Sequence, residues 1–486
     1  MRQRLPAIFK VLGMVIFVFG LSMSLPLAVS LSIGDAAQLA YDKAVLVTIG
    51  VGGLMWLINR NRREELRARD GFLLVVLIWV VLPLFAVLPL MIYLPQLSFT
   101  DAYFEAMSGL TTTGATVLSG LDALPPSINL WRTQLHLLGG MGVIVLVVAI
   151  LPLLGVGGRQ MFKAETPGPM KDVKLTPRMR ETAKGLWAVY GIITLACFIT
   201  FWGLGMDWLD ALIHAFSVMG LGGFSSHDAS FAHFDSVALE LAAMGFALLA
   251  GMNFATHFLA LRGHSLRPYR ADPEIRAYVL VVLGSAVGLA VYLWSNGVYA
   301  DLPTALRHAS FNTVSMATTL GLATQDFAAW PPIAGLWLLF LCSFSTCAGS
   351  TGGGIKMLRA MILYRQTQRE MVKLLHPTAE RPVRIGETLV PNKVVFAVLA
   401  FGFVYMASLA ILTLALVAGG LDAVSAFSAV VACVNNTGPG LGAVGPSTTY
   451  AVLTDAQTWV CTFAMLLGRL ELFTLLVVLT PGFWRK

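Results

Sequence analysis

Residues 107–117 read MSGLTTTGATV, a short stretch rich in threonine and glycine between the long apolar runs 71–94 and 137–155. Such a stretch has two interpretations. It is either an ordinary turn between helices or a piece of backbone that holds an ion. The rest of the sequence favours the second, because the same pattern returns three more times.

The composition is that of a protein that crosses a membrane many times. Of the 486 residues, 57% are hydrophobic and 12% charged, and the mean hydropathy is +0.76, whereas soluble proteins are about one quarter charged. Apolar runs of roughly 20 residues suffice to cross the hydrocarbon core. The first run is too long for a cleaved signal peptide. Ten predicted crossings result: 8–30, 40–58, 71–94, 135–156, 185–206, 236–261, 276–296, 331–369, 393–418 and 457–482.

Positive charge gathers on one side of this arrangement. With the N-terminus inside, 29 of the 33 Lys and Arg residues fall on inside segments, which predicts that both termini are cytoplasmic. The net charge of +7 therefore indicates contact with anionic lipid or an acidic partner, not with nucleic acid. The five cysteines lie in or beside apolar runs without a CxxC pair, so we expect small core residues, with no disulfide framework or zinc site.

The opening stretch is one of four copies of a unit. Aligned on one glycine, the copies read DAYFEAMSGLTTTGAT, DALIHAFSVMGLGGFS, HASFNTVSMATTLGLA and SAFSAVVACVNNTGPG. Each predicts a short re-entrant helix whose C-terminus points into the membrane, where its partial negative charge favours a cation. The predicted helix caps are Asp101, Asp210, His308 and Ser425. An alanine lies twelve residues before each glycine and a serine or alanine six before it: Ala102 and Ser108, Ala211 and Ser217, Ala309 and Ser315, Ala426 and Ala432.

The residues around each glycine form a predicted selectivity filter. Rings of backbone carbonyls can replace the hydration shell of a monovalent cation, and glycine allows the positive φ that turns successive carbonyls toward one axis. Because the side chains differ between copies, we expect the carbonyls to hold the ion. Asp101, Asp210 and Asp422 lie too early to form an acidic ring, and are interpreted as caps or mouth charges. The predicted lining is Thr112, Thr113, Gly114; Leu221, Gly222, Gly223; Thr319, Leu320, Gly321; and Asn436, Thr437, Gly438.

These filters resemble those of the TrkH/KtrB/HKT superfamily of potassium transporters. Four other stretches resemble the bacterial TrkH subfamily: WRTQLHLLGGMGVIVLVVAILPLL (131–154), FKAETPGPMKDVKLTPRMRETAKGLW (162–187), CAGSTGGGIKMLR (347–359) and LLGRLELFTLLVVLTPGFWR (466–485). The resemblance implies an all-α polytopic membrane protein with two N-terminal helices and four pseudo-fourfold helix–pore-helix–helix repeats around a central ion pore. The expected divisions are 1–70 for the two N-terminal helices, then repeats at 71–160, 161–265, 266–375 and 376–486.

The resemblance also implies a function and partners. The expected cargo is K⁺, with Rb⁺ as its surrogate, moved by a Trk system of the bacterial inner membrane that has no bound cofactor. A homodimer and a cytoplasmic TrkA-type ring that binds nucleotides are expected. In the plant branch of the superfamily, serine at the first filter glycine accompanies sodium transport, so Gly114 favours potassium. Leu221 stands where two other filters have threonine, which could loosen selectivity.

A glycine-rich break and a late arginine form the predicted gate. GSTGGG (349–354) interrupts the eighth crossing, and each glycine costs roughly 1 kcal/mol in a helix. By resemblance, Ala348 to Gly354 form an obstructing loop, and Arg469 completes the barrier below the filter. A packing kink and an ion pair of Arg469 with Glu471 are the structural alternatives. The glycines of the predicted gate are Gly349, Gly352, Gly353 and Gly354.

Other charged residues of the membrane region have ordinary interpretations. Lys356 and Arg359 are expected to reach the cytoplasmic surface. His214 and His257 are expected to be packed and hydrogen-bonded rather than members of a proton relay.

Three other functions compete with gated uptake. A proton-coupled symporter would need an acidic or histidine residue in the pore, and the sequence offers no convincing candidate. An intramembrane enzyme would need a nucleophile and base, but HEXXH, GXSXG and paired intramembrane aspartates are absent from the sequence. A structural scaffold would not need four aligned polar segments. We therefore expect a transporter and not an enzyme.

Overall fold

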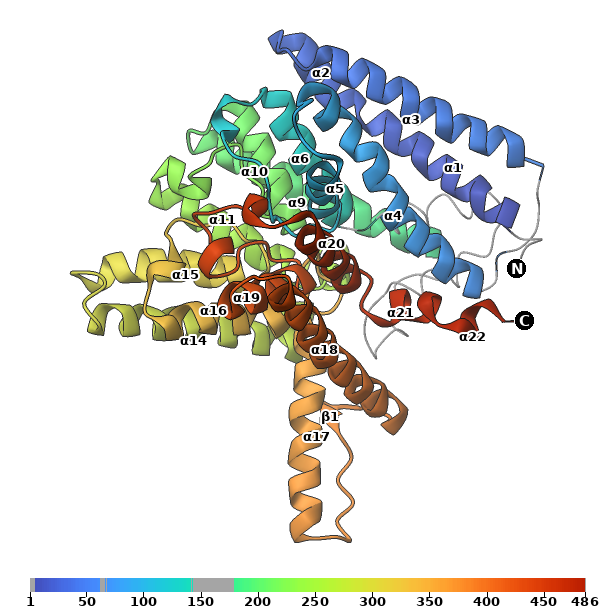
Figure 1. Ribbon diagram of the computed structural model, residues 1–486. Coiled ribbons are helices and arrows are strands. Elements are labelled where there is room, and N and C mark those ends of the chain that lie inside the picture. The colour runs from blue at the N-terminus through green and yellow to red at the C-terminus, as the bar shows by residue number, and fades with distance from the viewer. Residues whose placement is uncertain (1–4, 62–65, 67, 141, 143–178, 486) are drawn as a thin grey trace.

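The computed structural model describes residues 5–61, 66, 68–140, 142 and 179–485. These residues are mostly helical (Figure 1), with one small antiparallel hairpin formed by β1 (Arg384–Ile385) and β2 (Thr388–Leu389). Among them, six helices are long and apolar enough to cross a membrane, or up to eight if each sharply bent pair is one crossing. The all-α polytopic membrane fold that the sequence predicts is confirmed.

The N-terminal region and the first two repeats are built from these helices: α1 (Leu5–Ser22), α2 (Ser24–Ile33) and α3 (Gln38–Asn59); then α4 (Ala68–Tyr93), α5 (Phe99–Leu110), η2 (Leu121–Ala123) and α6 (Pro126–Gly140); then α9 (Met179–Gly203), α10 (Trp208–Gly220), η4 (Ser230–Phe234), α11 (Val237–Ala250), α12 (Phe254–Gly263) and α13 (Arg267–Ala271). The third and fourth repeats follow: α14 (Pro273–Ser295), α15 (Leu302–Ala317), η5 (Phe327–Ala329), α16 (Pro332–Phe344) and α17 (Met357–Leu375); then, after the hairpin, α18 (Asn392–Ala418), α19 (Ala423–Val434), η6 (Gly442–Val444), η7 (Tyr450–Val452), α20 (Asp455–Arg469), α21 (Phe473–Leu479) and α22 (Pro481–Trp484).

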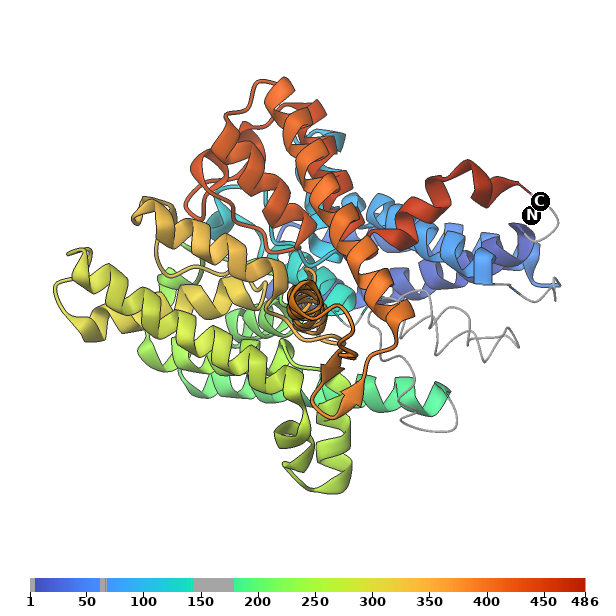
Figure 2. The same cartoon turned by 90° about the horizontal axis from the view of Figure 1, so that it is seen from below.

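The repeats surround a common centre. In Figure 2 the orange helix α17 is seen nearly end-on close to the middle, and the other repeats are arranged around it. Figure 1 shows α17 projecting from the body on one side, with the hairpin beside it. The short helices α5, α10, α15 and α19 occupy the place of the predicted re-entrant helix in each repeat. The alanines twelve residues before the filter glycines are fully buried: Ala102, Ala211, Ala309 and Ala426.

The predicted caps of these short helices are wrong, because each helix begins earlier. Asp101, Asp210 and Ser425 lie in the first helical turn, and His308 lies well inside α15. The residues that accept the first free backbone N–H groups are Ser98, Asp207, Asp301 and Asp422. The interpretation of Asp422 as a cap is therefore confirmed. Asp101 and Asp210 add negative charge near a helix N-terminus, which is favourable there without capping.

Two crossings predicted as continuous are sharply bent. The run 236–261 becomes α11 and α12 with a bend of 96°, and the run 457–482 becomes α20 and α21 with a bend of 115°. The eighth run is broken where the sequence predicts, between the end of α16 at Phe344 and the start of α17 at Met357. The second half of the crossing 135–156 and most of the basic loop 157–184 lie outside the described residues.

The bend between α11 and α12 is stabilised by hydrogen bonds from a distant segment. The carbonyl of Gly251 accepts from the Cys347 N–H at 3.0 Å, and that of Ala250 accepts from the Thr351 N–H at 3.3 Å. On the other side, the Asn253 side chain caps α12 through the Ala255 N–H at 2.9 Å. A helix broken inside a membrane must find such partners for its freed backbone groups, and the glycine-rich loop supplies them here.

The N-terminal helices α1 and α3 pack at close range through glycines. A Cβ atom on Gly52 would lie within 3.0 Å of the backbone of Phe17 and Gly13, whereas one on Gly50 would meet nothing within 4 Å. Small residues allow membrane helices to approach each other in this way. The N-terminal pair is therefore held by backbone contact as well as by side-chain packing.

We predict that Gly52→Ala lowers the melting temperature of the purified protein in detergent by several degrees, because overpacking a tight contact costs about 1–3 kcal/mol. Gly50→Ala, on the same helix but in open space, is the matched control and should melt at the parental temperature or above it. Equal melting temperatures for the two variants would contradict the close packing of α1 on α3.

Candidate ion filter and gate

The four filter segments, 112–114, 221–223, 319–321 and 436–438, have the same backbone conformation. Their final glycines all have positive φ, at 79° for Gly114, 83° for Gly223, 81° for Gly321 and 94° for Gly438. Their first residues are also left-handed although none is glycine: Thr112, Leu221, Thr319 and Asn436, with φ between 52° and 62°. This conformation costs roughly 1–2 kcal/mol per non-glycine residue. Strain of this kind, repeated four times, is typical of a functional site.

The left-handed residue ends each short helix. One residue further on, the backbone N–H returns to the carbonyl five positions earlier: from Thr113 to Ser108, Gly222 to Ser217, Leu320 to Ser315 and Thr437 to Ala432, at 2.8–3.0 Å. This is the bond of a Schellman ending. It explains why the same spacing recurs in all four copies, and an alanine such as Ala432 can make this bond because it uses only a backbone carbonyl. In the third repeat the Ser315 hydroxyl adds a bond to the Leu322 carbonyl at 2.6 Å.

The filter glycines bring the four segments into a closed ring. A Cβ atom on Gly114 would lie within 3.0 Å of the carbonyl oxygen of Gly222, in the next repeat. The same close approach joins Gly223 to Leu320, Gly321 to Thr437 and, closing the ring, Gly438 to Thr113. Each carbonyl belongs to the residue just before the next filter glycine. Any side chain at these glycines would separate neighbouring segments.

The side chains at the first filter positions are held by the scaffold. Leu221 stands where two other filter segments have threonine. It is fully buried in an apolar cluster, which accommodates the leucine side chain. Asn436 Nδ2 donates to Thr113 Oγ1 and to the Met465 carbonyl, both at 3.0 Å. The structure therefore brings together all twelve predicted filter residues, and it commits these two side chains to contacts with the protein.

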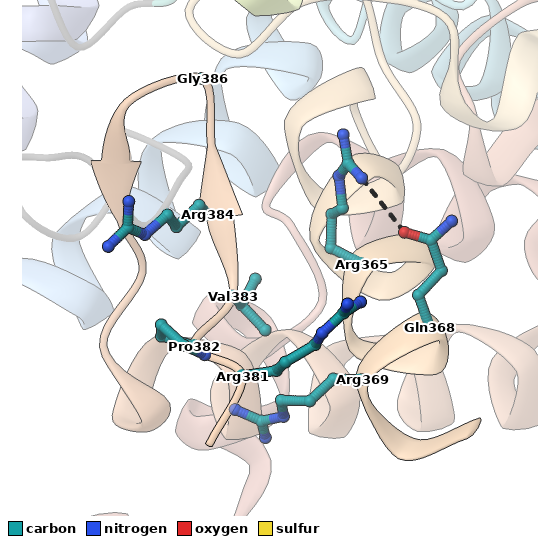
Figure 3. A pocket seen from close by; sticks show the side chains of 8 residues that line it. All are labelled: Arg365, Gln368, Arg369, Arg381, Pro382, Val383, Arg384 and Gly386. Carbon is teal, nitrogen blue, oxygen red and sulfur yellow. Dashed lines mark hydrogen bonds between the residues drawn. The ribbon is translucent and has the colours of Figure 1, made fainter. Parts of the chain in front are cut away.

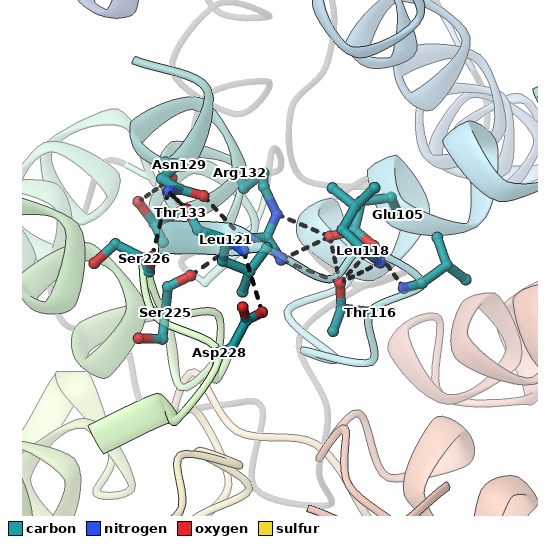
Figure 4. Close-up of polar contacts among 11 residues, drawn as sticks. Glu105, Thr116, Leu118, Leu121, Asn129, Arg132, Thr133, Ser225, Ser226 and Asp228 are labelled. Carbon is teal, nitrogen blue, oxygen red and sulfur yellow. Dashed lines mark hydrogen bonds and ion pairs between the residues drawn. The ribbon is translucent and has the colours of Figure 1, made fainter. Parts of the chain in front are cut away.

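A buried ion pair that the sequence analysis missed supports the first two filters (Figure 4). Arg132 Nε donates to Glu105 Oε1 at 2.8 Å, and both side chains are 1% exposed. Arg132 also donates to the Ser225 carbonyl at 3.1 Å, just after the second filter. Glu105 accepts from Thr116 Oγ1 and from the Val117 N–H, both at 3.0 Å, just after the first. The pair thus ties the backbone beyond one filter to that of the next.

The sequence contains a pattern that could have predicted these supporting contacts: a polar residue at a fixed distance before the filter glycine. Nine residues before the filter glycine stand Glu105, His214 and Asn312, each a polar residue in an apolar helix. His214 contacts Ser225 Oγ through Nε2 at 2.9 Å, and Asn312 Nδ2 donates to Thr324 Oγ1 at 3.2 Å. In the fourth repeat, where the offset falls on Ala429, Ser428 makes the equivalent bonds to Leu441.

Both singled-out histidines are packed and hydrogen-bonded, as predicted. His214 is buried between Ser225 and the Asp210 carbonyl. His257 is buried and contacts the Tyr269 hydroxyl at 2.7 Å and the Leu249 carbonyl at 2.9 Å.

The glycine-rich loop lies against the ends of the short helices. Thr351 Oγ1 donates to the Met219 carbonyl at 3.2 Å, and the Gly353 N–H donates to Thr319 Oγ1 at 3.0 Å. A Cβ atom on Gly353 would lie within 3.0 Å of the Asn435 carbonyl. The loop therefore contacts the second, third and fourth repeats next to their filter segments.

Arg469 joins this loop to the first repeat. Its guanidinium donates to the Thr351 carbonyl at 3.0 Å and to Thr112 Oγ1 at 3.2 Å. It also donates to the carbonyls of Gly139 and Gly140 at the end of α6. The predicted loop and arginine are thus in direct contact, beside the first filter segment.

Two predictions about nearby charges are wrong. Lys356 and Arg359 do not reach the surface: they are 4% and 8% exposed. Lys356 Nζ donates to the Gly352 carbonyl inside the loop. The structural alternative for Arg469 was an ion pair with Glu471. The ion pair described for Glu471 is instead with Arg359, at 2.6 Å. Arg359 also lies over the Phe401 ring, with 4.2 Å between its guanidinium carbon and the ring centroid. Its charged group is therefore packed against an aromatic ring, whereas that of a surface arginine is hydrated.

One group of potential metal ligands lies beyond the first two filters. Ligand atoms of Asp122, His227 and His233 all lie within 4.8 Å of one another. His227 already contacts Asp122 Oδ1 at 2.5 Å and Asp210 Oδ2 at 3.2 Å. Burial lowers the pKa of His227, but these two hydrogen bonds outweigh it, so the pKa lies above its ordinary value. Ion pairs hold His227, and His233 stacks on it with the ring centroids 3.5 Å apart, so these contacts account for the packing of the group.

We predict that Glu105→Ala lowers the melting temperature markedly, because a buried arginine left without its partner costs about 3–5 kcal/mol. Glu105→Gln keeps one acceptor oxygen, which can serve Thr116 and Val117, and should fall between Glu105→Ala and the parent. Glu387→Ala, in the exposed hairpin turn, is the control. Parental melting of Glu105→Ala would show that the pair does not support the filters.

Comparison with known proteins places this geometry in a family. The family model TrkH, described as cation transport protein, matches residues 39–484. The chain is 46% identical over 481 residues to the Trk system potassium uptake protein TrkH of Halomonas elongata and 44% identical over 481 residues to that of Escherichia coli, with 99% of both chains covered each time. Its fold matches the crystal structure of the potassium transporter TrkH from Vibrio parahaemolyticus with a TM-score of 0.90 and 42% identity, covering 99% of this chain and 100% of that one. The chain therefore belongs to the TrkH family of cation transport proteins.

Proposed function

We propose that this protein takes up K⁺ across the bacterial inner membrane through a filter lined by backbone carbonyls. The observation that carries the proposal is the closed ring of four glycines, each against the carbonyl before the next. A fourfold arrangement of carbonyls suits a dehydrated monovalent cation. The similar proteins in Halomonas elongata and Escherichia coli are named as potassium uptake proteins, which supports K⁺ as the cargo.

The proposed driving force is the membrane potential. It contributes about 2.3 kcal/mol per elementary charge per 100 mV, enough to concentrate a cation inside the cell. Both termini are cytoplasmic in this proposal, as the distribution of Lys and Arg indicates. The four repeats at 71–160, 161–265, 266–375 and 376–486 each contribute one filter segment, and 1–70 forms the N-terminal pair.

The proposed gate is the loop from Ala348 to Gly354 together with Arg469. The support is contact: the loop and the arginine touch all four repeats beside the filter. A cytoplasmic TrkA-type ring that binds nucleotides controls this gate, and the protein acts as a homodimer. These two partners are carried over from the family and are part of the proposal.

The first test is ⁸⁶Rb⁺ flux into liposomes that contain the purified protein, with an inward-directed potential and no pH gradient. Competition by K⁺ but not by Na⁺ or Li⁺ is expected. Flux that requires a pH gradient would establish the alternative, a proton-coupled K⁺ symporter. Flux without any preference for K⁺ would contradict the filter. If the protein is silent in both conditions, the measurement is repeated with the cytoplasmic ring, and silence there would overturn the proposal.

We predict that Gly114→Ser lowers discrimination between K⁺ and Na⁺ by about tenfold or more, equivalent to 1.4 kcal/mol. The reason is that a Cβ atom at this position must displace the carbonyl of Gly222. Gly120→Ser is the matched control, because Gly120 also has positive φ but nothing within 4 Å. Competition by Na⁺ against ⁸⁶Rb⁺ flux measures both variants, and unchanged discrimination in Gly114→Ser would remove Gly114 from the filter.

We also predict that Arg469→Ala, or deletion of 352–354, raises basal ⁸⁶Rb⁺ flux in the absence of the cytoplasmic ring. Either change removes contacts that hold the loop against the filter segments. Arg485→Ala, at an exposed position near the C-terminus, is the control. Low basal flux in both gate variants, with parental melting temperatures, would assign the loop a purely structural role.

A further inference from the structure

An open pocket rich in arginine lies between α17 and the β hairpin (Figure 3). Its volume is about 340 Å³, within the range of roughly 300–1,000 Å³ that small-molecule sites occupy. The lining consists of Arg365, Gln368, Arg369, Arg381, Pro382, Val383, Arg384 and Gly386. Figure 3 shows that Arg365 and Arg369 come from the helix, whereas Arg381 reaches toward them from the segment before β1.

The walls of this pocket are fixed by a small apolar core. Val383 and Ile385 are buried against Leu358 and Ile362 of α17, in a cluster that also includes residues of α18. The hairpin is closed by the pairing of Arg384 with Leu389. The arginines therefore project from a packed frame and not from a free loop.

The positive charge of the pocket is largely uncompensated. Among the described residues, Arg381 and Arg384 have no hydrogen bond or ion pair from their side chains, and Arg365 donates only to Gln368 at 3.1 Å. Of the carboxylates in the part of the chain that the structure describes, only Glu370 pairs with one of these arginines, 3.5 Å from Arg369 Nε. Glu380 and Glu387 are near in sequence but do not line the pocket.

Arg369 is tied to its surroundings by a hydrogen bond and has one long contact to a carboxylate. Its side chain is 11% exposed, and Nη1 donates to Asn392 Oδ1 at 2.9 Å. Its Nε makes no hydrogen bond and lies 3.5 Å from Glu370 Oε1. This long ion pair offsets little of the positive charge that the four arginines bring to the pocket.

We propose that this pocket binds a phosphate group. Four arginines from two elements line the pocket, and arginine can bind the oxygens of a phosphate with two parallel hydrogen bonds. The pocket is formed by α17, the helix that begins directly after the glycine-rich loop. Two sources share this chemistry: the headgroup of an anionic phospholipid and a soluble phosphate compound. The proposal does not depend on which ion the filter carries.

The test is native mass spectrometry of the full-length protein in detergent, titrated separately with phosphatidylglycerol and with inorganic pyrophosphate. We expect at least one probe to bind with a defined stoichiometry. The triple variant Arg365→Gln, Arg369→Gln, Arg381→Gln should weaken it by about tenfold or more. The probe that competes better when both are present identifies the source, lipid or soluble phosphate.

The matched control is Arg262→Gln, Arg267→Gln, Arg270→Gln, which removes the same charge from α12 and α13 and should retain binding. Equal loss in the two triple variants would mean attraction by net charge only, and would overturn the proposal. Failure of both probes to bind the parent would also overturn it. Arg381→Gln alone, which removes no described contact, should weaken binding at the parental melting temperature, so misfolding is separated from loss of the site.

Discussion

The architecture depends on the close approach of one backbone to another, four times around a ring. Each filter glycine lies where a Cβ atom would strike the carbonyl before the next filter glycine. This approach requires positive φ at four glycines and a left-handed residue two positions earlier in each segment. The Schellman endings, the buried alanines and the polar braces behind the filters all stabilise that otherwise strained backbone. A packed frame of this kind is what lets a strained conformation persist.

The repeated unit was predictable because it has a fixed offset. The filter glycines, the alanines twelve positions earlier and the break before α17 can all be found by aligning the sequence with itself. The first residues of the short helices could not be predicted in the same way. Ser98 and Asp101, for example, both suit a helix cap, and the sequence alone does not rank them. The bend after α11 depends on hydrogen bonds from Cys347 and Thr351, and such distant partners leave no local pattern. The burial of Lys356 and Arg359 likewise depends on acceptors and rings far along the chain.

The proposed filter and the proposed gate are connected through side chains in this structure. Thr112 and Thr319 begin their filter segments, yet their hydroxyl groups accept hydrogen bonds from Arg469 and from the Gly353 N–H. These two hydroxyl groups therefore link one filter segment to Arg469 and another to the loop. Movement of the loop would break the hydrogen bond from the Gly353 N–H to Thr319. It would also break the bond from Arg469 to the Thr351 carbonyl. The two remaining segments hold the equivalent side chains, Leu221 and Asn436, within the protein scaffold.

The ring is closed by contacts between the ends of the repeat region. Asn436 donates to Thr113, 323 positions away, and Tyr450 donates its backbone N–H to the Thr116 carbonyl. Asn436 is synthesised 323 residues after Thr113, so this contact cannot form before the fourth repeat has been made. During synthesis on the ribosome, three quarters of the filter can be inserted while no closed ring exists. The cell membrane is thus not exposed to a completed pore until the last repeat has entered the bilayer, and a truncated chain lacks the wall that the fourth segment provides.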